Sequence, residues 1–254
     1  MDRGGGAGRS RRSLCSAFEL GGKAPLIVFD DADLDVVVPQ LVMSCILMNG
    51  QFCCTGSRVL AQRGIADELR TRLAAGLEAV EVGPAEDPSS RLGPLIDKAG
   101  VVRGDRMVEE AASSYAEVIV RGGPVTDPEL SGGAFYRPAL LEVERLDVPL
   151  VQQEVFGPVQ TFEVFEDEAD AVRRANATEF GLAASVFTRD DFRARRVGRD
   201  LRFGGIRVNC WGAMSVHFEQ GGVKQSGYGL LCGPSAITEF QNLKLYAAVA
   251  PQPS

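Results

Sequence analysis

Short apolar runs alternate with longer amphipathic runs along most of this chain, and that alternation limits the folds open to it. Strand-like apolar runs include residues 26–29, 57–62 and 182–188. Residues 66–80 and 98–116 repeat apolar side chains at helical spacing. Strands that alternate with helices predict an α/β domain with a mostly parallel sheet and helices on both faces.

The remaining runs extend the same pattern. Further helices are expected over about residues 33–48, 166–175, 190–203 and 234–240, and further strands over 117–123, 135–143, 155–165, 204–209 and 243–250. The acids Asp30, Asp31 and Asp33 suit the amino end of the first of these helices. The sequence has neither GxGxxG nor GxxxxGK[ST], so it shows neither of these phosphate-binding motifs.

The length and the net charge of the chain limit the classes of function open to it. The 254 residues suffice for one large domain, and a net charge of −7 argues against a nucleic-acid partner. No apolar stretch is long enough to span a membrane. The Gly- and Arg-rich start, residues 1–17, lacks the apolar core of a secretory signal and is interpreted as a disordered lead-in, or less readily as an organelle-targeting segment. We therefore expect a small-molecule partner and a cytoplasmic protein with reduced thiols.

Six cysteines and one histidine are the candidates for thiol or metal chemistry. There is no CxxC pair, so no metal site is expected. Cys53 and Cys54 lie side by side among polar residues and glycines, where backbone amides could stabilise a thiolate. A cysteine is more often a small buried residue than a nucleophile, and Cys45, Cys210 and Cys232 are interpreted as core residues.

A nucleophilic cysteine needs a base. His217 stands alone, which is more typical of a structural histidine, so a Cys–His hydrolase is weakly supported. Glu19 lies between Phe18 and Leu20, and partial burial there would raise its pKa toward a value useful for a general base. The alternative is a surface glutamate that begins a turn, and the residues alone favour that simpler interpretation.

Several motifs, in order along the chain, resemble those of the aldehyde dehydrogenase superfamily. ELGGK at residues 19–23 is followed, 34 positions after its glutamate, by the cysteine of GQFC. The other similar segments are EVFGPV at 154–159, NATEFGLAASVFT at 176–188, IRVN at 206–209, GGVKQSGYG at 221–229 and TEFQNLKLYAAV at 238–249. The resemblance covers about residues 18–248, and several motifs in register are far more specific than any one of them.

The resemblance implies oxidation of an aldehyde to a carboxylic acid with NAD or NADP as acceptor. Cys53 matches the nucleophile that forms a thiohemiacetal and then a thioester, and Glu19 matches the base that activates water. Glu154 matches the residue that binds the nicotinamide ribose, and Phe156 the residue that packs near the nicotinamide. Gly21 matches a glycine that allows close approach to that ring. The aldehyde, and the choice between NAD and NADP, are not specified.

The chain also departs from the family pattern. Family members are about twice as long, and the part that would precede ELGGK holds most of the cofactor domain and the asparagine of the oxyanion hole. Cofactor binding by this chain is therefore expected to be impaired. Leu230 and Leu231 stand where the family commonly has Arg and Glu, which suggests slower release of the acid.

The resemblance divides the chain into three parts. Residues 1–17 are the lead-in, and 18–242 are the catalytic domain, with a remnant of the cofactor domain near its C-terminal end. Residues 243–254 are an oligomerisation strand and tail, through which a homo-oligomer is expected because an unpaired strand edge seeks a partner. Two alternatives stay open: a cofactor-independent thiol esterase that uses Cys53 and Glu19, and a non-catalytic oligomerising fragment.

Overall fold

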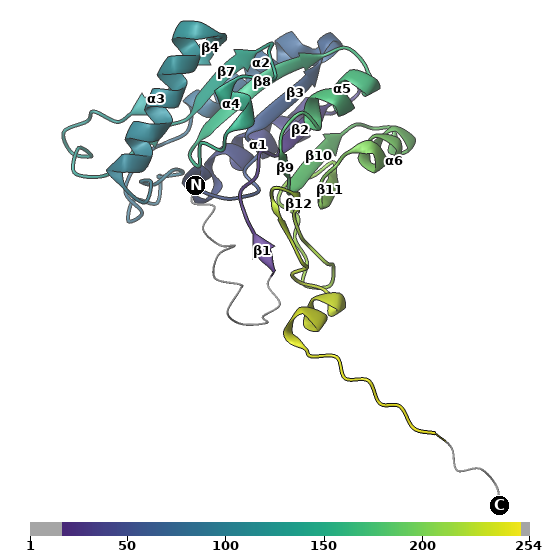
Figure 1. Cartoon of the computed structure of the whole chain (residues 1–254). Helices are drawn as coiled ribbons and strands as arrows, with labels where there is room; N and C mark the ends of the chain where they lie inside the picture. The colour runs from purple at the N-terminus through teal and green to yellow at the C-terminus, as the bar shows by residue number, and fades with distance from the viewer. Residues whose placement is uncertain (1–16, 250–254) are drawn as a thin grey trace, which may run out of the picture.

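A computed structural model describes residues 17–249, and its centre is a seven-stranded sheet (Figure 1). The spatial order is β11 (Gly205–Val208), β10 (Ala183–Phe187), β2 (Pro25–Val28), β3 (Arg58–Gln62), β8 (Val159–Phe165), β7 (Ala139–Val143) and β4 (Ala116–Val120). Every neighbouring pair is parallel except β4 and β7, which are antiparallel. The predicted mostly parallel sheet is confirmed.

Helices cover both faces of this sheet, as expected for parallel strands that are buried on both sides. On one face lie α1 (Leu34–Ile46) and α2 (Ala66–Glu78), packed against residues such as Leu26 and Val59. On the other lie α3 (Lys98–Ser114), α4 (Pro149–Gln152), α5 (Glu168–Ala175) and α6 (Asp191–Asp200), packed against residues such as Ile27, Leu60 and Leu141. Consecutive residues of β2 thus enter different cores, as the strand period of two requires.

Aspartates set the start of several helices. The Asp33 side chain accepts a hydrogen bond from the Asp35 backbone N–H at the beginning of α1, as the run of acids predicted. Asp97 and Asp190 do the same for α3 and α6. Each carboxylate satisfies a backbone donor that the helix itself leaves unpaired.

A smaller ribbon lies beside the sheet. The strand β1 (Phe18–Glu19) pairs antiparallel with β13 (Gly227–Tyr228), and β9 (Phe180–Gly181) pairs with β12 (Val223–Lys224). The Phe18 and Tyr228 rings pack edge to face at 5.1 Å. This ribbon fixes the segment before β2 against the glycine-rich segment late in the chain. A two-stranded hairpin, β5 (Gly123–Pro124) with β6 (Tyr136–Arg137), lies near α3.

The C-terminal segment differs from expectation. The 3-10 helix η4 (Pro234–Phe240) forms where a short helix was predicted, but residues 241–249 form neither helix nor strand. They project away from the sheet (Figure 1), and Leu243, Leu245, Tyr246 and Val249 are almost fully exposed. A strand needs a second strand for its hydrogen bonds, and this segment meets none within residues 17–249. Across these residues, no helix is long and apolar enough to cross a membrane.

Candidate active site

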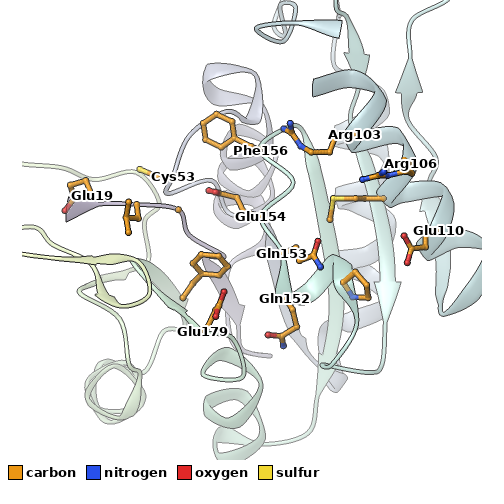
Figure 2. Close-up of a pocket in the computed structure, with 15 residues that line it drawn as sticks. Glu19, Cys53, Arg103, Arg106, Glu110, Gln152, Gln153, Glu154, Phe156 and Glu179 are labelled. Carbon is orange, nitrogen blue, oxygen red and sulfur yellow. The ribbon is translucent and has the colours of Figure 1, made fainter. Parts of the chain in front are cut away.

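The residues singled out in the sequence come together at the amino-terminal edge of the parallel sheet. Gly21 lies just before β2, Cys53 before β3, and Glu154 and Phe156 before β8. With Glu19 these residues line one cavity of about 900 Å³, whose far wall includes Arg103, Arg106 and Glu110 of α3 (Figure 2). Because neighbouring parallel strands begin at the same edge, side chains from distant segments of sequence meet there.

The backbone around the nucleophile is held by a tight turn. The 3-10 segment η2 (Leu47–Gly50) ends α1 with three successive positive φ angles, 50° at Met48, 59° at Asn49 and 70° at Gly50. The Asn49 side chain accepts from the Gly93 N–H at 2.9 Å and donates to the Pro94 carbonyl at 2.9 Å. Asparagine tolerates this left-handed conformation better than most residues, and the two bonds hold it there.

Two further contacts fix the cysteines themselves. A β-carbon on Gly22 would lie under 3.0 Å from the Cys53 carbonyl oxygen, so glycine is required for the ELGGK segment to approach the loop. The Trp211 indole N–H donates to the Cys54 carbonyl at 3.1 Å, and the Trp211 ring packs edge to face on Phe52 at 6.3 Å. Both thiols are free and partly buried. The loop is therefore clamped from two sides.

This setting favours a reactive thiolate at Cys53. Its hydrogen bond with the Cys54 thiol lowers the pKa of Cys53 to about 7, although burial and the charges of Glu19 and Glu154 act in the opposite direction. The same bond, with burial, raises the pKa of Cys54. Cys54 is therefore the thiol donor of the pair, and Cys53 is the thiol that ionises near neutral pH.

Glu19 is positioned by the β1–β13 ribbon. The next residue, Leu20, donates its backbone N–H to the Ser226 carbonyl at 3.1 Å, and the Glu19 carboxylate accepts from the Gly222 backbone N–H. Although Glu19 is largely exposed, partial desolvation of its carboxylate raises the pKa of Glu19 and outweighs the opposite effect of that hydrogen bond. Figure 2 shows Glu19 beside Cys53, on the side away from Glu154. The predicted direction of its pKa is confirmed.

Glu154 lies on the opposite side of Cys53. One of its carboxylate oxygens accepts from the Gly22 N–H at 3.1 Å, and a β-carbon on Gly21 would lie under 3.0 Å from the other oxygen. Burial raises the pKa of Glu154, while the Gly22 bond and the charges of Lys23 and Arg103 lower it. Gly21 thus leaves the space that this carboxylate occupies.

Sequence reasoning missed a buried charge cluster behind the site. Lys23 is fully buried, and burial, together with the Arg58 charge, lowers the pKa of Lys23 to about 7 against the opposing charges of Glu154 and Glu163. Arg58 and Glu163 form a bidentate pair at 2.8 Å with no exposed surface. Arg58 is the first residue of β3, five positions after Cys53, so the pair anchors the strand that follows the nucleophile.

A second, smaller cavity of about 110 Å³ meets the first at Glu19 and Cys53. Its other lining residues include Cys54, Arg207 and Cys232. Cys45 is buried as predicted, whereas the prediction that Cys210 and Cys232 are core residues is wrong. Cys210 lies two residues after the edge strand β11, and Cys232 lies in the loop before η4, so neither is enclosed between helix and sheet.

His217 does not join the site. It lines neither cavity, and its backbone N–H donates to the Ser215 hydroxyl at 3.2 Å. Over residues 17–249, no group of three or more His, Cys, Asp or Glu side chains is arranged to hold a metal ion. The reactive groups that line both cavities are the Cys53 thiol and the Glu19 carboxylate.

Comparison with known proteins agrees with this arrangement. The sequence profile described as "Aldehyde dehydrogenase family" matches residues 9–246. A betaine aldehyde dehydrogenase of Sinorhizobium fredii is 38% identical over 226 residues, which are 89% of this chain and 46% of that protein. The human 4-trimethylaminobutyraldehyde dehydrogenase is 38% identical over 229 residues, again 89% of this chain and 46% of that protein.

Solved structures show the same relation. A crystal structure of betaine aldehyde dehydrogenase from Staphylococcus aureus in complex with NAD+ superposes with a TM-score of 0.85 at 35% identity. The match covers 88% of this chain and 44% of that one. The chain thus spans about half the length of the relatives it matches.

Proposed function

This chain belongs to the aldehyde dehydrogenase family, and from that premise we propose that it supplies the catalytic residues for oxidation of an aldehyde to a carboxylic acid with NAD or NADP as acceptor. The observation that carries the proposal is the juxtaposition of Cys53 and Glu19. The thiol has a pKa lowered to about 7, the carboxylate has a raised pKa, and both line the same two cavities.

In the first step the Cys53 thiolate attacks the carbonyl carbon of the aldehyde. A carbon–sulfur bond forms, and the electron pair of the carbonyl moves to oxygen, giving a thiohemiacetal. The backbone N–H of Cys53 is a donor for that oxygen. The hydrogen bond from the Cys54 thiol favours the ionised form of Cys53 before the attack.

The larger cavity suits the nicotinamide end of the cofactor. The Glu154 carboxylate can accept hydrogen bonds from two ribose hydroxyls, and Phe156, 39% exposed at a positive φ, offers an aromatic face. Gly21 keeps the Glu154 carboxylate close to the backbone. When bound, NAD(P)+ would accept the hydride that leaves the former aldehyde carbon.

Glu19 completes the reaction. A thioester on Cys53 must be hydrolysed, and Glu19 is placed to take a proton from water. The resulting hydroxide adds to the thioester carbon, the carbon–sulfur bond breaks, and the Cys53 thiolate is regenerated with release of the acid. Leu231 lines the smaller cavity beside Glu19 and supplies no second carboxylate there, which supports the expectation of slow acid release.

The direct test is aldehyde-dependent formation of NAD(P)H by the purified chain, followed by absorbance, with Cys53→Ser as control. Among residues 17–249, Glu154 and Phe156 are proposed to contact the nicotinamide end of the cofactor, and we expect weak cofactor binding and a high apparent KM for NAD(P)+. Turnover that survives Cys53→Ser would contradict the assignment of the nucleophile.

A second function is supported by the same pair of residues. Cys53 and Glu19 together could hydrolyse activated esters without any cofactor, since acylation needs only the thiolate and deacylation only the base. Ester turnover that persists without NAD(P)+ and disappears in Cys53→Ser would support it. A reducing, cytoplasmic compartment is part of both proposals, because the nucleophile must remain a free thiol.

Self-association is proposed from the C-terminal segment. The exposed apolar side chains of residues 243–249 and their unpaired backbone suit strand pairing with a second copy. Size-exclusion chromatography of a chain that lacks residues 243–250 tests this. An unchanged oligomer would rule out the segment as the contact, and an associating chain without thiol reactivity would favour the non-catalytic alternative.

A further inference from the structure

The smaller cavity approaches Cys53 from a different side than Glu154. Of these two cavities, Glu154, Phe156 and Gly21 line the larger and not the smaller, whereas Cys54 and Arg207 line the smaller and not the larger. If the larger cavity takes the nicotinamide, as the proposed function holds, the substrate chain must leave the carbonyl toward the smaller one. The side chains there then determine which aldehyde fits.

Among residues 17–249, Arg207 is the only cationic side chain that lines the smaller cavity, and Glu19 is the only acidic one. It belongs to β11, where it pairs in register with Ser185 of β10. Its Nε donates to the Ala213 carbonyl at 2.8 Å, which fixes the guanidinium relative to the loop after the strand. A β-carbon on Gly205 would lie 3.2 Å from Nη1, so the glycine leaves room for the guanidinium.

The positive charge of Arg207 has no paired carboxylate. Among the ion pairs within residues 17–249, none involves Arg207, although most arginines of α5 and α6 form them. Its charge reaches the nucleophile loop, because it acts to lower the pKa of Cys54. An unpaired guanidinium beside a partly enclosed cavity favours an anion there.

We propose that Arg207 binds the distal anionic group of the substrate, so that this chain acts on a short aldehyde that also carries a carboxylate. This inference rests on the proposed function and names its substrate class. A planar guanidinium recognises a carboxylate through two parallel hydrogen bonds, and Nη1 and Nη2 present such a fork once Nε is engaged. The volume of about 110 Å³ restricts the substrate to a short chain.

The relatives provide the contrast. The names of the Sinorhizobium and human proteins specify betaine aldehyde and 4-trimethylaminobutyraldehyde, both of which carry a trimethylammonium cation. A cation placed in the smaller cavity would face the like charge of Arg207, and unpaired like charges act as a barrier to the wrong ligand. This chain is therefore inferred to reject the substrates for which its relatives are named.

The first experiment uses charged thiol reagents and needs no cofactor. Methanethiosulfonates with a sulfonate, a neutral methyl or a trimethylammonium group share one reactive centre, and modification of Cys53 is followed by mass spectrometry of its peptide. After normalisation to the same reagents on free cysteine, the sulfonate should react about tenfold faster than the trimethylammonium reagent at low salt. Arg207→Gln should abolish that preference.

Two further variants make the test specific. Arg207→Lys keeps the charge and should keep the sign of the preference, which separates charge from loss of folding. Arg195→Gln removes an exposed charge of α6 that lines neither cavity and should leave the preference unchanged. Absence of any anionic preference in the unchanged chain, or its persistence in Arg207→Gln, would overturn the inference.

A turnover assay then separates this inference from the proposed function. With NAD(P)+, an ω-carboxylate aldehyde should have a kcat/KM about tenfold above that of a neutral aldehyde of equal length, and Arg207→Gln should remove the difference. No turnover of any aldehyde, with the reagent preference intact, would refute the dehydrogenase proposal and leave the anion site. Turnover of aldehydes without any charge preference would support the dehydrogenase proposal and refute the anion site at Arg207.

Discussion

The Cys54 thiol should control the reactivity of its neighbour, and Cys54→Ala tests this most directly. The thiol forms the hydrogen bond that lowers the pKa of Cys53 to about 7, whereas burial and two nearby carboxylates push it up. Alanine cannot donate, so the pKa of Cys53 in the variant should rise to 9.0, the ordinary value, or beyond.

The magnitude follows from two opposing effects. At pH 7 a thiol with a pKa of about 7 is about half ionised, and one with a pKa of about 9 is about 1% ionised, a loss of about 50-fold. A more basic thiolate is also more nucleophilic, by about eightfold for two units of pKa at a Brønsted coefficient of 0.4–0.5. Alkylation of Cys53 at pH 7 should therefore slow by about sixfold, and above pH 9 the variant should react faster.

The assay is the pH dependence of the iodoacetamide rate constant, measured on the Cys53 peptide because other free thiols are present. Cys54→Ser retains a hydroxyl donor and should keep the pKa of Cys53 below that of the alanine variant. Cys232→Ala removes another thiol from the smaller cavity, which Cys54 also lines, and should leave the pKa of Cys53 unchanged. An alanine variant whose rate profile coincides with that of the unchanged chain would refute the role of the Cys54 bond.

Three other predictions test the framework around the site. Glu163→Gln leaves the buried Arg58 guanidinium uncompensated and should lower the free energy of unfolding in urea by about 3–5 kcal/mol; a loss below 1 kcal/mol would contradict this. Gly22→Ala should slow alkylation of Cys53 and lower the free energy of unfolding by about 1–3 kcal/mol. Gly132→Ala is the control, because no atom lies within 4 Å of the added carbon, and it should change neither quantity. Glu19→Gln should preserve the acylation burst with an activated ester and slow hydrolysis of the acyl-enzyme by about 10²–10⁴-fold. In the wild-type chain, hydrolysis of the acyl-enzyme should become faster as pH rises through the Glu19 pKa, which lies above 4.5. Equal steady-state ester turnover in both proteins would exclude Glu19 as the base.

The fold could be predicted from sequence because its elements carry strong local patterns. The helix expected over residues 66–80 is found at Ala66–Glu78, and the one over 98–116 at Lys98–Ser114. Leu69, Leu73 and Leu77 of α2 recur at helical spacing and are all buried, so periodicity and burial coincide. No strand forms at residues 243–249 within this chain, since a strand depends on a partner that local sequence does not reveal, and its pairing with a second copy stays a prediction.

The residues of the candidate site could be predicted only in part from the sequence. The resemblance to a known family pointed to Cys53, Glu19 and Glu154, and the structure places them around one cavity. The sequence did not predict roles for Lys23 and Arg207. Nothing in the local sequence shows that Lys23 is fully buried or that Arg207 lines a cavity. Such roles depend on packing between segments far apart in the chain, which residue spacing alone does not specify.

The reactivity of the Cys53 thiol and the affinity for the cofactor are expected to depend on different parts of the protein. Each reactive group lies just before a strand of the central sheet or on the ribbon beside it, and helices packed on both faces of the sheet hold it in place. The reactive geometry of Cys53 and Glu19 therefore depends on residues within this chain. In the proposed function Glu154 and Phe156 contact the nicotinamide end, and binding of a dinucleotide depends on more surface than that. We therefore expect a preparation that is alkylated at Cys53 with an apparent pKa of about 7 but reduces NAD(P)+ slowly.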